Sequence, residues 1–95
     1  MKIKIFAYQS FHRFYQALPA PIQKKVDKQI RLLTANPRHP SLQTHVFHSL
    51  AHPYHPAEKV FEAYVQQHTP AAYRLFWCYG PQKSQITVLA ITPHP

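Results

Sequence analysis

Residues 21–36, PIQKKVDKQIRLLTAN, contain the most regular pattern in the sequence. Four apolar residues fall within about 80° of arc at 100° per residue: they are Ile22, Val26, Ile30 and Leu33. Pro21 suits the first turn of a helix, and Asn36 precedes a proline and therefore avoids helical geometry. The pattern predicts an amphipathic helix that begins near Pro21, ends at Asn36 and packs through one narrow stripe.

A shorter helix is expected just before it. Apolar residues recur there at helical spacing between Ser10, a residue type that caps helices, and Pro19: they are Phe11, Phe14, Tyr15 and Leu18. A Pro-Ala-Pro corner joins the two segments. Because this corner is so short, the two helices should form an antiparallel or steeply crossed hairpin.

Four runs rich in β-branched and aromatic residues flank this hairpin, at positions 2–8, 60–66, 73–79 and 85–92. Gly80 and Pro81 mark a hairpin turn between the last two runs. The order β-α-α-β-β-β predicts a single α+β domain over residues 1–95, with the helical hairpin on one face of an antiparallel sheet.

Composition restricts the class of protein. The chain of 95 residues is long enough for one domain with one core, and 45% hydrophobic residues exclude a disordered basic tail. No apolar run approaches the roughly 20 residues that span a membrane, and the N-terminus lacks the unbroken apolar stretch of a signal peptide. The single cysteine, Cys78, excludes an internal disulfide, lies in an apolar run typical of core, and suits a reducing cytosol. We therefore expect a cytoplasmic protein with no membrane association.

Eleven Lys and Arg face only three Asp and Glu, a formal charge of +8 that indicates an anionic partner. Three of the cations, Lys24, Lys28 and Arg31, lie opposite the apolar stripe of the long helix together with Asp27, and Arg38 follows the helix. Such a cluster is typical of a polyanion site, yet a solvated helix face or a surface for an acidic protein explains it equally well.

A segment rich in proline and histidine, residues 37–57, has no sustained periodicity and is expected to form a long, partly ordered loop. His45 and His48, like His52 and His55, are spaced three residues apart, which permits a transition-metal site. No Cys, Asp or Glu follows before Glu58, so a His-rich surface loop without metal is the better interpretation.

Strand alternation places Glu62 and Tyr64 on one face of the run at 60–66, and Arg74 on the polar side of the next run. An acid, a phenol and a fixed cation on adjacent strands could abstract a proton and hold a phosphate. The alternative is a cross-strand Glu62–Arg74 salt bridge on a solvated face. His94 stands alone after the last run, at a strand exit where sites are often built.

Taken in order, these segments resemble the RelE/ParE superfamily of bacterial type II toxins, over nearly the whole chain. The resemblance rests on an ordered set of segments that closes with His94: they are FYQALP at 14–19, IQKKVDKQIRLL at 22–33, NPRHPSL at 36–42, VFEAYV at 60–65, YRLFW at 73–77 and ITVLAI at 86–91. It implies a four-stranded antiparallel sheet with two N-terminal helices.

The resemblance also implies an activity. RelE-like members are endoribonucleases that cut mRNA, many of them on the ribosome, by attack of the ribose 2′-hydroxyl on the neighbouring phosphate. Arg74 matches the arginine that contacts this phosphate, His94 matches a histidine that some members use as acid or base, and Glu62 stands in a commonly acidic position. Tyr64 occupies a position often filled by arginine, and the lysine-rich loop of ribosome-dependent members is absent.

On this basis the expected catalytic residues are Arg74, His94 and Glu62, with His94 as general acid and Glu62 as the base or the group that orients it. The residues expected to bind RNA are Lys24, Lys28, Arg31, Arg38 and Tyr64. No metal or other cofactor is expected, and the expected partners are RNA and an acidic antitoxin. Two alternatives are a ParE-like inhibitor of DNA gyrase without enzymatic activity and a degenerate member that only binds its antitoxin.

Overall fold

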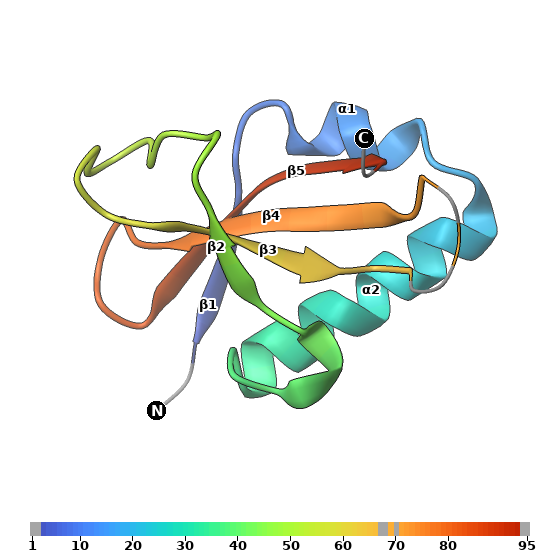
Figure 1. Ribbon diagram of the computed structural model, residues 1–95, viewed down its shortest axis with the longest axis horizontal. Helices are drawn as coiled ribbons and strands as arrows, with labels where there is room; N and C mark the ends of the chain where they lie inside the picture. The colour runs from blue at the N-terminus through green and yellow to red at the C-terminus, as the bar shows by residue number, and fades with distance from the viewer. Residues whose placement is uncertain (1–2, 67–68, 70, 94–95) are drawn as a thin grey trace.

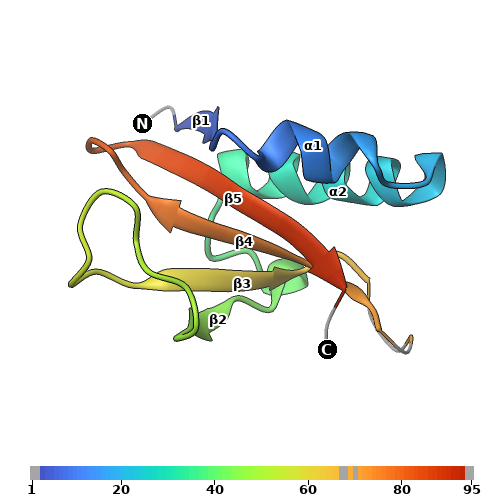
Figure 2. The same cartoon turned by 90° about the horizontal axis from the view of Figure 1, so that it is seen from above.

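A computed structural model describes residues 3–66, 69 and 71–93 of the chain. Two helices, a short 3-10 helix and five strands follow one another along it (Figure 1): they are β1 (Lys4–Ala7), α1 (Phe11–Gln16), α2 (Ala20–Ala35), η1 (Pro40–Leu42), β2 (His45–Phe47), β3 (Val60–Tyr64), β4 (Tyr73–Tyr79) and β5 (Gln85–Pro93). The strands form one sheet in the order β1-β5-β4-β3-β2. Both helices lie on the same side of this sheet (Figure 2), so the predicted α+β class and helical hairpin are confirmed.

The predicted four-stranded antiparallel sheet is wrong in two respects. β2 is an additional strand at one edge, paired antiparallel with β3, and β1 at the other edge runs parallel to β5. Strands β2 to β5 form an antiparallel meander, and its last strand runs in the same direction as β1 where the two meet. The direction of β1 thus depends on the path of the whole chain, which no local pattern encodes.

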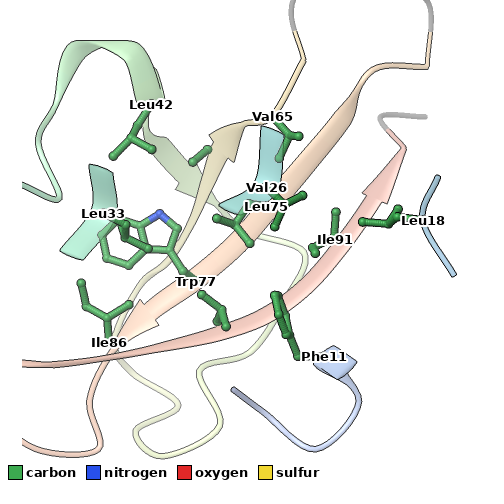
Figure 3. Packing of buried hydrophobic residues seen from close by; sticks show 12 residues of the cluster. Phe11, Leu18, Val26, Leu33, Leu42, Val65, Leu75, Trp77, Ile86 and Ile91 are labelled. Carbon is green, nitrogen blue, oxygen red and sulfur yellow. The ribbon is translucent and has the colours of Figure 1, made fainter. Parts of the chain in front are cut away.

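The apolar stripe of α2 supplies the centre of the core. Val26 and Leu33 are fully buried, and Ile22 and Ile30 pack partly buried against the same cluster. Figure 3 shows Val26 and Leu33 with side chains of the sheet face that the helices cover, Trp77 among them. The polar Gln29 is also buried in this stripe, because its amide donates to the backbone oxygen of Tyr64 at 2.6 Å.

A hydrogen bond joins the two helices. The Tyr15 hydroxyl donates to the Asp27 carboxylate at 2.7 Å, and this bond, with partial burial, raises the pKa of Tyr15 above 10.0. Asp27 is therefore half-buried against α1 and does not belong to the exposed basic face. Ser10 does occupy the N-cap position of α1, but its side chain makes no capping hydrogen bond.

The segment at 37–57, expected to be a loop, contains η1 and β2 and is anchored by a buried histidine. His52 is 2% exposed, and its Nδ1 accepts from the backbone N–H groups of Tyr54 and His55. Since Nδ1 accepts twice, the proton lies on Nε2, which donates to the backbone oxygen of Tyr79 at 2.6 Å. A buried side chain with three backbone partners fixes the segment to the end of β4.

Beneath this segment lies a second apolar cluster, on the sheet face turned away from the helices: its buried members are Val60, Phe76, Cys78 and Leu89. Cys78 is fully buried, and burial together with the charge of Glu58 raises the pKa of its thiol to about 11. Cys78 is a core residue, as predicted, and its thiol stays protonated at neutral pH.

Two further properties concern the described residues only. No three His, Cys, Asp or Glu side chains among residues 3–66, 69 and 71–93 come together in a way that could hold a metal ion. In the same part of the chain, no helix has the length and apolar character needed to cross a membrane.

Candidate active site on the sheet face turned away from the helices

The register of three neighbouring strands brings polar side chains to one face of the sheet. His45 of β2 lies opposite Glu62 of β3, and Tyr64 of β3 lies opposite Arg74 of β4. Their neighbours along β3 and β4 point into the helix-covered core, so alternation turns these four side chains to the other face. The structure thus brings together Glu62, Tyr64 and Arg74, as the sequence predicts, and adds His45.

Glu62 forms an ion pair with His45, between carboxylate Oε1 and imidazole Nε2. The Glu62 side chain is only 5% exposed, whereas that of His45 is 50% exposed. The other imidazole nitrogen, Nδ1, faces the backbone oxygen of Gln43 at 3.3 Å, near the outer limit of a hydrogen bond. A buried carboxylate therefore holds a solvent-accessible imidazole in a fixed orientation.

Arg74 is bound to the connection between β3 and β4. Its Nη1 donates to the backbone oxygens of Gln66, Ala72 and Tyr73 at 3.1–3.3 Å, and the residue as a whole is 9% exposed. Its Nε is buried and has no hydrogen-bond partner among the described residues. Within that part of the chain Arg74 makes no ion pair with Glu62, so the alternative of a cross-strand salt bridge does not describe the structure.

Tyr64 lies between the ion pair and the arginine. The Arg74 Cζ is 3.9 Å from the centroid of the Tyr64 ring, a cation–π contact. On its other side, the Tyr64 ring meets the His45 ring edge to face, with centroids 6.1 Å apart. The four side chains therefore form a continuous row across the sheet, with a carboxylate, an imidazole, a phenol and a guanidinium in sequence.

The basic residues expected to bind RNA are distributed differently. Lys24, Lys28 and Arg31 are exposed on α2, which covers the opposite side of the sheet. Lys28 lines a polar cavity of about 290 Å³ with Gln66 at the end of β3, whereas Arg38 lines a separate cavity beyond the C-terminus of α2. The structure does not gather these cations around Glu62.

His94 lies outside the described residues, so the structure does not test its predicted role. The strand before it, β5, places Thr92 opposite Arg74 and ends at Pro93, which lies opposite Tyr73.

The sequence predicts a surface loop at His45 and does not assign this residue to the site. The strand that carries it is three residues long, too short for alternation to be recognised. Val46 and Phe47, an apolar pair directly after His45, are the only local signal of that strand.

The fold closely matches solved toxin structures from three organisms. The archaeal RelE–RelB complex from Pyrococcus horikoshii OT3 matches with a TM-score of 0.72 at 13% identity, over 98% of this chain and 96% of that chain. The YoeB/ParE toxin from Agrobacterium tumefaciens matches with a TM-score of 0.71 at 12% identity, over 98% of this chain and 100% of that chain. The toxin of the intact E. coli RelBE complex gives 0.68 at 10% identity, over 98% of each chain.

The chain has the fold of RelE and YoeB toxins. No protein-family model matches its sequence, and no curated protein is similar to it in sequence. At 10–13% identity these RelE-type structures bear on the fold alone, so the chemistry of the RelE-like fold must be argued from its own side chains.

Proposed function

We propose that this RelE-like chain is an endoribonuclease that cleaves mRNA by activating the ribose 2′-hydroxyl for attack on the adjacent phosphate. The observation that carries the proposal is the pairing of half-exposed His45 with buried Glu62, beside Tyr64 and Arg74. In the proposed reactive form His45 is neutral and donates its Nε2 proton to Glu62, so Nδ1 carries no proton, does not hydrogen-bond the Gln43 oxygen and can act as a base. A carboxylate that orients an imidazole through one nitrogen leaves the other nitrogen for proton transfer.

In the proposed reaction, His45 Nδ1 takes the proton of the 2′-hydroxyl. The 2′ oxygen forms a bond to phosphorus while the bond from phosphorus to the 5′ oxygen breaks. His94 gives a proton to that leaving oxygen, and the products carry a 2′,3′-cyclic phosphate and a 5′-hydroxyl. Protein side chains alone supply the base and the acid.

Arg74 supplies a fixed positive charge beside the phosphate in this scheme. Its Nη1 is already committed to three backbone oxygens, so a bidentate clamp is not the role that its contacts support. The Tyr64 ring lies against this guanidinium, with Cζ 3.9 Å from the ring centroid, and brings a phenol to the same part of the sheet. Together they would stabilise charge that develops on the phosphate.

The test is cleavage of labelled mRNA by the purified chain, with and without ribosomes. We expect His45→Ala and Glu62→Gln each to lower the cleavage rate by roughly 100-fold or more, because each removes the oriented base. His48→Ala is the matched control, since His48 is an exposed histidine of the same segment, and it should cleave at the wild-type rate. Intact RNA with the wild-type chain, or equal rates for His45→Ala and His48→Ala, would contradict the proposal.

We also propose an acidic antitoxin as the partner that neutralises the chain. Two of the structurally similar proteins are RelE–RelB and RelBE complexes, and a formal charge of +8 favours an acidic protein. Co-expression with the acidic product of an adjacent reading frame should suppress RNA breakage in cells. Growth arrest with intact RNA and defective DNA supercoiling would instead indicate a ParE-like inhibitor of gyrase.

A further inference from the structure

We propose that a cavity at the C-terminal end of α2 binds a nucleotide, with its base against an aromatic wall and its phosphate at Arg38. The cavity has a volume of about 470 Å³, within the range of small-molecule sites. It lies between the segment that follows α2 and the ends of β3 and β4. The proposal concerns binding and does not depend on the proposed RNA cleavage.

Three aromatic side chains form one wall of the cavity. The rings of Phe61 and Trp77 are stacked, with centroids 4.8 Å apart and an interplanar angle of 27°. The Tyr79 ring meets both nearly at right angles and is 46% exposed, so an entering ring can reach it. Stacking of a base on such a side chain stabilises binding and needs no particular base.

Two buried polar atoms in the lining residues have no hydrogen-bond partner in the part of the chain that the structure describes. Neither Trp77 Nε1 nor Thr44 Oγ1 has a hydrogen-bond partner among the described residues, and both are buried. A buried donor without an acceptor is unfavourable, and an acceptor group that reaches it would remove this cost. Both atoms are closed to bulk water, so a ligand in the cavity reaches them only where its entry displaces part of the lining.

The charge of the lining selects an anion. Arg38 is exposed at the cavity, and its backbone N–H donates to the Asn36 side chain. The lining also contains two further titratable groups, the His39 imidazole and the Tyr79 phenol. None of the described residues that line the cavity is acidic. The Arg38 cation matches a phosphate, and the aromatic wall matches a flat ring. The indole N–H of Trp77 and the hydroxyl of Thr44, both without a partner among the described residues, match acceptor atoms on that ring.

A nucleotide unit combines these three features, and it could come from a free mononucleotide or from an RNA strand. The cavity lies close to the proposed active site in the chain, because Thr44 of its lining directly precedes His45. A strand that passes around β2, the edge strand of the sheet, could occupy both places.

Trp77 is the only tryptophan of the chain and lines the cavity, so its fluorescence reports binding directly. The purified chain is titrated with AMP, GMP, CMP and UMP, and with a short single-stranded RNA carrying 2′-O-methyl groups, which block attack by the 2′ oxygen. We expect a saturable change in Trp77 fluorescence with these probes and none with ribose 5-phosphate, which lacks the base.

Variants distinguish binding in the cavity from non-specific attraction of an anion to the positive charge of the chain. Arg38→Gln should weaken binding about tenfold and Thr44→Val several-fold, since they remove a charge-assisted bond and a neutral one. Arg13→Gln, which removes an exposed α1 cation outside the cavity, should bind like wild type. Glu62→Gln, which removes the carboxylate of the proposed active site, should also bind normally, so loss of cleavage and loss of binding are distinguishable.

Tighter binding of the RNA than of any mononucleotide would identify a strand as the source, and equal affinity would identify free nucleotides. The proposal is overturned if no probe changes the fluorescence, if ribose 5-phosphate acts like AMP, or if Arg38→Gln and Arg13→Gln weaken binding equally.

Discussion

At the scale of single residues, Cys78 and Tyr15 hold their protons more tightly in the folded chain than in the unfolded one. Burial and Glu58 raise the pKa of Cys78 from 9.0 to about 11, and the bond to Asp27 raises the pKa of Tyr15 above 10.0. A raised pKa means that the folded state binds more protons, so this stability is complete below pH 9. It is lost as the pH rises through the folded-state values.

We therefore expect the free energy of unfolding to fall between pH 9 and about 11. Two pKa units at 1.36 kcal/mol each set an upper limit of roughly 3 kcal/mol for Cys78. Urea unfolding at several pH values should show a flatter pH dependence for Cys78→Ala than for wild type, whatever its stability at neutral pH. Tyr15→Phe should flatten only the most alkaline part, and identical curves for wild type and Cys78→Ala would contradict the assignment.

In the candidate site, the sequence predicts which face of the sheet a residue occupies but not which partner it contacts. Glu62, Tyr64 and Arg74 are predictable as one face, because strand alternation has a period of two and their strands are five and seven residues long. The partners of Glu62 and Arg74 are not predictable in this way. His45 reaches Glu62 through an edge strand of three residues, and Arg74 turns to backbone oxygens that become available only when the β3–β4 connection folds.

At the scale of elements, the segment between β2 and β3 depends on His52. Replacement by Ala would leave the backbone N–H groups of Tyr54 and His55 and the backbone oxygen of Tyr79 without this partner. We expect His52→Ala to lower the free energy of unfolding by about 2–4 kcal/mol, because unpaired buried groups cost about 1–3 kcal/mol each and some regain water.

Chemical denaturation and amide hydrogen exchange would test this expectation. Exchange at Tyr54 and His55 should accelerate more than exchange in α2. His55→Ala is the matched control, because His55 is exposed and should change stability by less than about 0.5 kcal/mol. Equal destabilisation by the two variants would show that His52 does not anchor the segment.

The elements themselves differ in how far the sequence predicts them. α2 is predictable in place and burial because its pattern spans sixteen residues, and β4 begins and ends where predicted. β2 and the parallel pairing of β1 are not, since edge pairing and strand direction arise from contacts between distant segments. The buried Gln29 is a further exception, because its polar side chain is recognisable as core only once Tyr64 is beside it.

At the scale of the whole molecule, the positive charge lies on more than one side. The Debye length is about 8 Å at physiological salt, so an exposed cation acts on a phosphate mainly at close range. Lys24, Lys28 and Arg31 are exposed on α2, which covers the sheet face opposite to the one that carries Arg74. If these cations bind RNA, as proposed from the sequence, they must do so by direct contact with phosphates.

Direct contact predicts a specific salt dependence. Each phosphate contact to single-stranded RNA contributes about 0.7 to the slope of log affinity against log salt, so three contacts contribute about 2. The variant K24Q/K28Q/R31Q should lower that slope by about 2 when binding of an uncleavable RNA is measured by fluorescence anisotropy between low and high salt. Glu62→Gln should leave the slope unchanged, because it removes no cation. An unchanged slope in the triple variant would mean that RNA does not contact this helix face, which would then be available for an acidic antitoxin.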